Sequence, residues 1–86
     1  MGKQKPLLNV QVLSENGALF NGECDGLLLP YNKEEIAILP QHTPIVALLT
    51  VGEIKVIEHG KERIVAEIKS GILYVAEEKT VILINT

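Results

Sequence analysis

Aromatic residues are scarce in this chain of 86 residues, which contains two tyrosines, one phenylalanine and no tryptophan. A hydrophobic core therefore has to be built from Val, Ile, Leu and Ala, and such a β-branched, aliphatic composition favours strands. The formal net charge is only −3, and acidic and basic residues are interspersed. Without a basic stripe for phosphates or a row of rings for bases, the chain is not expected to bind nucleic acid.

Cysteine and long hydrophobic runs are equally rare. Cys24 is the single cysteine, which excludes an internal disulfide and a paired redox or metal motif. We interpret it as a small buried hydrophobe in a reducing compartment. The longest purely aliphatic run, Ile45 to Leu49, is far shorter than the roughly 20 residues of a membrane-spanning helix. The start, MGKQKPLLNV, has no continuous hydrophobic region and predicts no signal peptide, so we expect a protein that is soluble or reaches a membrane through a partner.

Strand patterns recur along the sequence, whereas no long stretch has helical periodicity. Apolar and polar residues alternate from Leu8 to Val12 and from Glu53 to Val56. The same alternation places Ile64, Ala66 and Ile68 on one face of a half-buried strand. Turn residues such as ENG, EHG and KSG separate these segments. The pattern predicts one all-β domain, an antiparallel β-sandwich or flattened barrel of roughly eight to ten short strands, with its ordered core from about residue 7 to 86.

Two expected strands, GLLLP and TVILIN, are apolar on both faces. A strand of this kind is buried on both sides, or it leaves one side as a patch for a partner. The sequence leaves both interpretations open.

Residues in patterns typical of catalysis are absent. The sequence has no Walker loop and no nucleophile-elbow motif. Its two histidines lie in different loops, and the paired glutamates at 34–35 and 77–78 lie in turn-like segments where solvated charges are common. We therefore predict no catalytic, cofactor or metal site, and we do not expect an enzyme.

His42 stands between Pro40 and Pro44 in the segment LPQHTP. The two prolines restrict the backbone, and an imidazole can donate, accept or change charge near neutral pH, which suits a residue that contacts a partner. The alternative is a loop histidine that hydrogen-bonds its own turn, and residue chemistry alone favours this alternative.

The order of several short motifs nevertheless resembles a known family. These motifs are Phe20-Asn21-Gly22, then Glu35, Leu39, Pro40, His42 and Pro44, then Gly52 with a charged strand, then Ser70 to Val75, and finally Val81 to Ile84. From about Leu8 to Thr86 the chain resembles the amino-terminal β-sandwich of the epsilon subunit of rotary F-type ATP synthase, called delta in mitochondria. Ala37 and Gln41 replace glycines that are common in this family. If the glycine at position 41 has a positive φ, Gln41 is strained there or the loop differs.

The resemblance implies a non-catalytic subunit of the central stalk that binds the gamma subunit and the c-ring and couples ion-driven rotation to ATP synthesis. The implied gamma contacts are Leu39, Pro40, Gln41, His42 and Thr43, and the implied c-ring contacts are the nearby Glu34 and Glu35. It further implies a peripheral membrane protein on the cytoplasmic face of the bacterial inner membrane, with no nucleotide bound directly. It also implies that residues 1–86 hold the sandwich alone, without the helical hairpin that commonly follows it in this family and can inhibit ATP hydrolysis.

Two alternatives come from other classes of protein. One is a lipoyl or biotinyl carrier domain with Lys79 at a hairpin tip, although Lys79 lies close to the end of the sequence and lacks the usual flanking methionines. The other is a small hydrolase that uses His42, for which the sequence offers no nucleophile partner.

Overall fold

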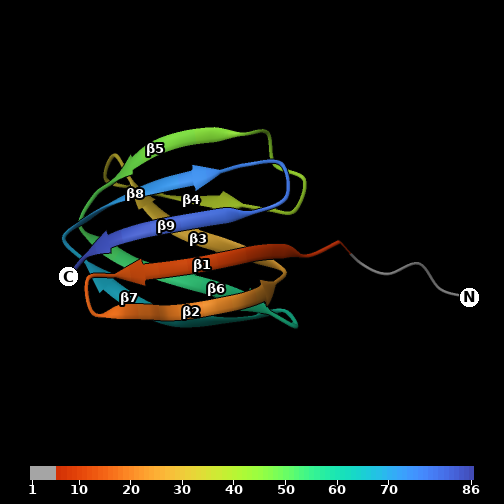
Figure 1. Ribbon diagram of the computed structural model, residues 1–86, viewed down its shortest axis with the longest axis horizontal. Coiled ribbons are helices and arrows are strands. Elements are labelled where there is room, and N and C mark those ends of the chain that lie inside the picture. Colours follow the sequence, from red (N-terminus) through yellow and green to blue (C-terminus); the bar gives the residue numbers. More distant parts are fainter. Residues whose placement is uncertain (1–5) are drawn as a thin grey trace, which may run out of the picture.

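The structure, a computed structural model, describes residues 6–86, and in this part of the chain it has nine strands and no helix (Figure 1). Residues 1–5 (MGKQK), on which the signal-peptide prediction partly rests, lie outside the described residues. The strands are β1 (Leu8–Ser14), β2 (Gly17–Cys24), β3 (Gly26–Tyr31), β4 (Glu34–Ile38), β5 (Ile45–Leu49), β6 (Gly52–Glu58), β7 (Lys61–Ile68), β8 (Ser70–Val75) and β9 (Thr80–Asn85).

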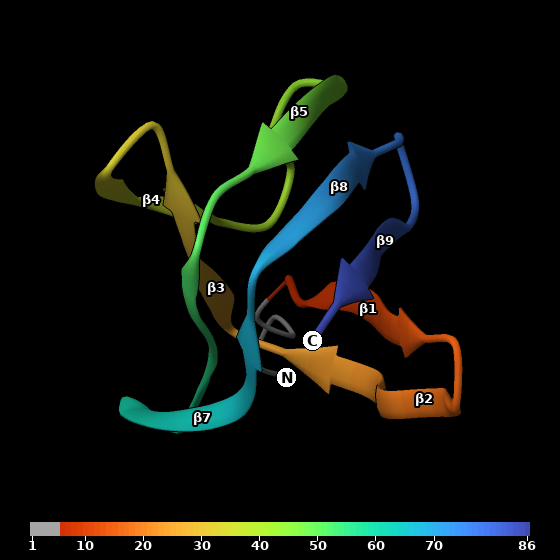
Figure 2. The ribbon, with the colours of Figure 1, turned by 90° about the vertical axis from the view of Figure 1, so that its left-hand side faces the viewer.

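The strands form two sheets that pack face to face (Figure 2). We call the five-stranded sheet, in the order β2-β1-β9-β8-β5, sheet A, and the four-stranded sheet, in the order β4-β3-β6-β7, sheet B. Six of the seven strand pairings in the described chain are antiparallel, and β1 pairs with β9 in parallel. The predicted all-β sandwich is confirmed, with its strand number inside the predicted range.

The core between the sheets is aliphatic and follows the alternation of the sequence. Leu8, Val10 and Val12 of β1 point inward, while the residues between them do not. The side chains with no exposed surface are Val10, Val12, Leu27, Leu29, Ile54, Val56, Leu73 and Ile82. Cys24 is buried as well, its Sγ lies 3.3 Å from the carbonyl oxygen of Gly26, and burial raises the pKa of its thiol.

The two strands that are apolar on both faces lie in the interior of their sheets. β3 lies between β4 and β6, and β9 lies between β1 and β8. For β9, the second interpretation holds, because Ile82 is fully buried on the inner face whereas its neighbour Leu83 is 41% exposed on the outer face. β9 thus lies in the interior of its sheet and still leaves apolar side chains exposed on the outer face.

The expectation for β7 is wrong at one residue. Ala66 and Ile68 are buried, but Ile64 is 53% exposed. The register between β6 and β7 shifts, so that Ile54 pairs with Ala66 while Lys55 pairs with Ile64. A bulge of this kind adds one residue to one strand and turns the following side chains to the other face. Ile64 therefore lies beside the outward-facing Lys55.

Side-chain contacts near β2, β6 and β7 close one flank of the sandwich. The guanidinium of Arg63 on β7 lies 5.7 Å from the ring centroid of Phe20 on β2. Asp25, between β2 and β3, accepts a hydrogen bond from the backbone N–H of His59 at 2.8 Å, and its own N–H donates to the carbonyl of Ile57. Asp25 thereby joins the β2–β3 corner to the β6–β7 hairpin, where His59 has a positive φ of 54°.

Replacing Asp25 with alanine is expected to lower the free energy of unfolding by about 1 to 2 kcal/mol, because the N–H of His59 loses a charged acceptor. Urea unfolding of the two proteins measures the difference. Glu15→Ala, in the exposed turn between β1 and β2, is the matched control and is expected to change stability by less than about 0.5 kcal/mol. Equal stabilities of Asp25→Ala and the native protein would show that this corner does not depend on the carboxylate.

Candidate docking surface

The segment from Leu39 to Pro44, which we call the contact loop, connects β4 in sheet B to β5 in sheet A. The N–H of His42 donates to the carbonyl of Leu39 at 3.2 Å, and Gln41 has a φ of 65°. Proline at the second position and positive φ at the third are the features of a type II β-turn. A glycine, which the resemblance implies at position 41, would adopt this positive φ without strain. Of the two expectations for this loop, a strained Gln41 is therefore the one that the structure has.

Gln41→Gly is expected to raise the free energy of unfolding by about 0.5 to 1 kcal/mol, because relief of the left-handed strain exceeds the added freedom of the unfolded chain. The shift of the urea midpoint at constant slope measures it. Gln11→Gly, at an extended position inside β1, is the control and is expected to destabilise the protein. A loss of stability in Gln41→Gly would mean that the glutamine side chain contributes more than its backbone costs.

His42 is half-buried within the contact loop. Its Nδ1 lies 2.7 Å from the carbonyl oxygen of Thr43, so Nδ1 carries the proton in the neutral ring and Nε2 is an acceptor. The hydrogen bond within the turn, one of the two interpretations of the sequence, is therefore present. It also fixes the orientation of the ring, and a fixed ring presents Nε2 in one direction.

The contact loop lies against the β8–β9 hairpin. A small concavity of about 120 Å³ is lined by Gln41 and His42 on one side and by Glu77, Glu78 and Lys79 on the other, together with residues near the start of β1. The N–H of Ala76 donates to the carbonyl of Lys79 at 2.9 Å, which closes the hairpin. This end of the molecule is polar at its rim.

Glu34 and Glu35 lie at the opposite end of β4 from the contact loop. Glu35 Oε2 is 3.2 Å from Lys55 Nζ, and Glu62 Oε1 is 4.0 Å from the same ammonium. The hydrogen bond and the charge of Glu35 raise the pKa of Lys55. Leu39 follows Glu34 by five residue steps of extended chain, a distance on the order of 16 Å. The two sets of residues proposed from the sequence are therefore not neighbours, contrary to the expectation.

Residues 50–53, between β5 and β6 and at the start of β6, lie next to Glu34 and Glu35. Thr50 donates its N–H to the carbonyl of Pro30, and a hollow of about 220 Å³ brings Glu34, Glu35 and Glu53 together. Gly52 is required here, because its φ is +156° and an added Cβ would lie 2.6 Å from the Cβ of Pro30. Lys33 lines the same hollow, so this second end of the sandwich carries charges of both signs with an excess of carboxylates.

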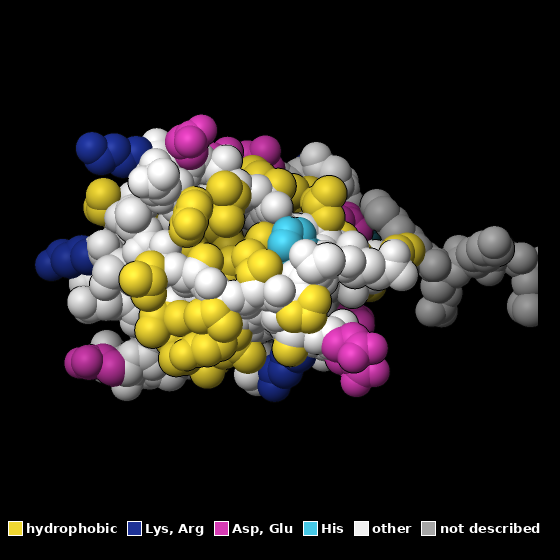
Figure 3. All heavy atoms as spheres, turned by 90° about the horizontal axis from the view of Figure 1, so that it is seen from above, with side chains coloured by type: hydrophobic (Ala, Val, Ile, Leu, Met, Phe, Trp, Pro, Cys, Tyr) yellow, Lys and Arg dark blue, Asp and Glu magenta, His cyan; other side chains and the backbone are white. Residues whose placement is uncertain are grey.

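The outer side of sheet A carries a hydrophobic surface that is not among the contact residues predicted from the sequence. We define the apolar face as the apolar outward residues of β1, β5, β8 and β9, namely Leu13, Val46, Leu48, Ile72, Tyr74, Val81 and Leu83. They form two rows across the paired strands, Leu48-Ile72-Leu83-Leu13 and Val46-Tyr74-Val81. Leu48 is 70% and Val46 68% exposed. Hydrophobic side chains are seen gathered on the flank shown in Figure 3.

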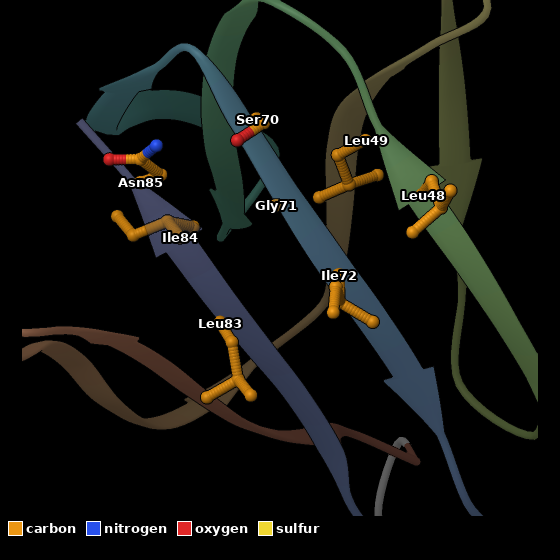
Figure 4. A pocket seen from close by; sticks show the side chains of 8 residues that line it. All are labelled: Leu48, Leu49, Ser70, Gly71, Ile72, Leu83, Ile84 and Asn85. Atoms are coloured by element: carbon orange, nitrogen blue, oxygen red, sulfur yellow. The ribbon is translucent and has the colours of Figure 1, made fainter.

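A shallow groove crosses the apolar face. It measures about 410 Å³, and its lining includes Leu48, Ile72 and Leu83 from three adjacent strands (Figure 4). Ser70 and Asn85, which pair with each other, form its polar end. The continuous run Ile45 to Leu49 and the strand TVILIN were the sequence signals of this surface.

The two outer faces of the sandwich differ in charge. The outward residues of sheet B include Glu35, Glu53, Lys55, Glu62 and Glu67. None of the outward residues of β1, β5, β8 and β9 is charged, and the outer side of sheet A carries Glu23 only on its edge strand β2. Surfaces that are apolar and uncharged at the centre and polar at the rim are typical of stable protein interfaces. Sheet A therefore presents the better docking surface.

No three His, Cys, Asp or Glu side chains among residues 6–86 are grouped so that they could hold a metal ion. The same part of the chain contains no helix long and apolar enough to cross a membrane.

Comparison with known proteins identifies the family. The model of the "ATP synthase, Delta/Epsilon chain, beta-sandwich domain" family matches residues 7–86. The chain belongs to this family. The epsilon chain of Bordetella avium is 35% identical over 81 residues, which cover 92% of this chain and 56% of that protein. The epsilon chain of a Sulfurovum species is 29% identical over 79 residues, with 92% and 62% covered.

The chain thus spans about three-fifths of the length of these epsilon chains. A chain in the Euglena gracilis mitochondrial ATP synthase structure, which contains OSCP, F1 and the c-ring, matches with a TM-score of 0.78 and 21% identity, covering 99% of this chain and 53% of that one. A chain in the Tetrahymena thermophila central stalk and c-ring structure has a TM-score of 0.70 at 16% identity, with 100% and 67% covered. These two matches support the fold, and membership of the family argues against a carrier domain with a modified Lys79.

Proposed function

We propose that this sandwich is a non-catalytic part of the central stalk of an ATP synthase, where it joins the gamma subunit to the c-ring and transmits rotation between them. The match of residues 7–86 to the delta/epsilon family carries this proposal. Residues 6–86 contain no helix, so the role assigned here is the coupling of rotation, and inhibition of ATP hydrolysis is not ascribed to them.

The gamma subunit is assigned to the contact loop and the adjoining apolar face. The loop leads directly into β5, so that His42 and Leu48 belong to one continuous segment of surface. The apolar face supplies area that can be desolvated, and the fixed ring of His42 supplies a directional acceptor at its border. Leu39, Pro40, Gln41 and Thr43 complete the loop side of this contact.

The c-ring is assigned to the acidic end formed by Glu34 and Glu35. Their carboxylates suit basic or amide groups in the polar loops of a membrane ring. Exposed ion pairs contribute only about 0 to 1 kcal/mol each, so these residues set the register of the contact more than its strength. The separation of this end from the contact loop along β4 leaves room for both partners at once. The protein would thus be peripheral to the membrane, on its cytoplasmic face, through its partners.

Capture of a tagged protein from membranes of the source organism tests the proposal. The native protein is expected to recover gamma and c-subunit together. His42→Ala is expected to lower the recovery of gamma several-fold. Glu35→Gln is expected to leave the recovery of gamma unchanged. In a separate capture from membranes stripped of gamma, Glu35→Gln is expected to lower the recovery of the c-subunit. Absence of both subunits, with the tagged protein folded and the complex intact, would refute the stalk assignment.

A further inference from the structure

β5 is the one edge strand of the described sandwich without a charged residue. The sheets end in four edge strands, β2 and β5 in sheet A and β4 and β7 in sheet B. β2 carries Glu23, β4 begins with two glutamates, and β7 contains four charged residues, Lys61, Glu62, Arg63 and Glu67. β5 reads Ile-Val-Ala-Leu-Leu. Charges at an edge are a common means of preventing contact with another sheet, and β5 lacks them.

The outer side of β5 is also open along its backbone. The strand pairs with β8 on one side over Ile45 to Leu49. Apart from strand pairing, no backbone hydrogen bond described in residues 6–86 involves these five residues, and the next contact is the Thr50 N–H to Pro30 beyond the end of the strand. Figure 2 shows β5 at the margin of its sheet. Donors and acceptors on this side are available to another strand.

We propose that two copies of this chain associate through this edge, β5 against β5 in antiparallel fashion about a two-fold axis at Ala47. Val46 of each copy then lies opposite Leu48 of the other, and the two copies of sheet A become one continuous sheet. The inference uses the edge alone and does not depend on the role in the stalk.

The absence of charge explains why the occupant is a second copy. A two-fold axis brings each residue near its own equivalent, so an edge that pairs with itself has to be self-complementary. Two copies of β4 would gather the carboxylates of Glu34 and Glu35 from both chains along one seam. Two copies of β7 would have to desolvate four charged side chains per chain, two of each sign, whose ion pairs in water contribute little. Along β5 the facing side chains are aliphatic, and cross-strand aliphatic pairs are favourable.

Sedimentation equilibrium from micromolar to millimolar protein tests the association. The native chain is expected to reach twice the monomer mass. The double variant Val46→Lys with Leu48→Lys puts like charges directly opposite each other across the seam and is expected to weaken the dimer at least about tenfold. The matched control, Leu19→Lys with Ile64→Lys, places the same charges at exposed residues of β2 and β7 and is expected to associate like the native chain.

Mixing complementary variants tests the register. The Val46→Lys, Leu48→Lys chain and a Val46→Glu, Leu48→Glu chain, each monomeric alone, are expected to form a one-to-one dimer, because lysine then faces glutamate at both positions. In the native dimer, every second amide of residues 45–49, those whose N–H points away from β8, is expected to exchange more slowly than in the dilute monomer, since these amides gain hydrogen bonds.

Three results would each overturn the inference. They are a native chain that stays monomeric at millimolar concentration, a dimer that survives the double lysine substitution, and a dimer in which residues 45–49 gain no protection from exchange. The last would indicate packing of apolar faces or another partner surface instead of edge pairing.

Discussion

Leu48→Glu is expected to weaken the binding of purified gamma subunit by about 30- to 100-fold, equivalent to about 2 to 3 kcal/mol. Leu48 lies at the end of a row across the apolar face, lines the groove and is 70% exposed in the sandwich alone. A glutamate there stays in water in the free subunit, so folding is not affected. In the complex its carboxylate would be buried among aliphatic side chains without a partner, which is costly.

Ile64→Glu is the matched control, because it makes the same kind of change at a residue that is 53% exposed on sheet B. It is expected to leave the affinity for gamma unchanged. Calorimetric titration at subunit concentrations below self-association measures both variants, and circular dichroism confirms their fold. Equal affinities of Leu48→Glu and the native protein would move the gamma contact away from sheet A, whereas a loss in Ile64→Glu would assign it to sheet B.

The fold could be predicted from the sequence because its information is local. Alternation at Leu8 to Val12 and turn residues between short apolar segments depend only on neighbouring residues, and both appear in the structure. Ile64 was misplaced because a bulge is decided by how β7 pairs with β6, which no alternation within β7 reveals. The parallel pairing of β1 with β9 likewise joins the two ends of the described chain, and hairpin signals predict only antiparallel neighbours.

The candidate site was predicted less completely. The motif around His42 pointed to the contact loop, and Gln41 has the positive φ considered for the glycine that the resemblance implies at this position. Glu35 was expected near the His42 loop because the two are close in sequence, but the extended strand β4 lies between them and places them at its opposite ends. The apolar face arises from four strands that are distant in sequence, so its rows became visible only with the register of sheet A.

Ile82→Ala is expected to be the most destabilising of the substitutions considered, with a loss of about 3 to 4 kcal/mol in the free energy of unfolding. Ile82 has no exposed surface and lies on β9, between β1 and β8, where the surrounding strands cannot collapse into the space left by its side chain. A domain of this size has a total stability of about 4 to 13 kcal/mol, so this single change removes a large part of it.

Leu83→Ala is the control, since Leu83 is the next residue on the same strand but is 41% exposed on the apolar face. Its expected cost is about 1 kcal/mol or less, because much of the side chain is already in water. The difference between the two urea midpoints tests the register of β9, as a slip of one residue would exchange its inner and outer faces. A larger cost for Leu83 than for Ile82 would therefore place the apolar face in the core and remove the surface on which the proposed gamma contact rests.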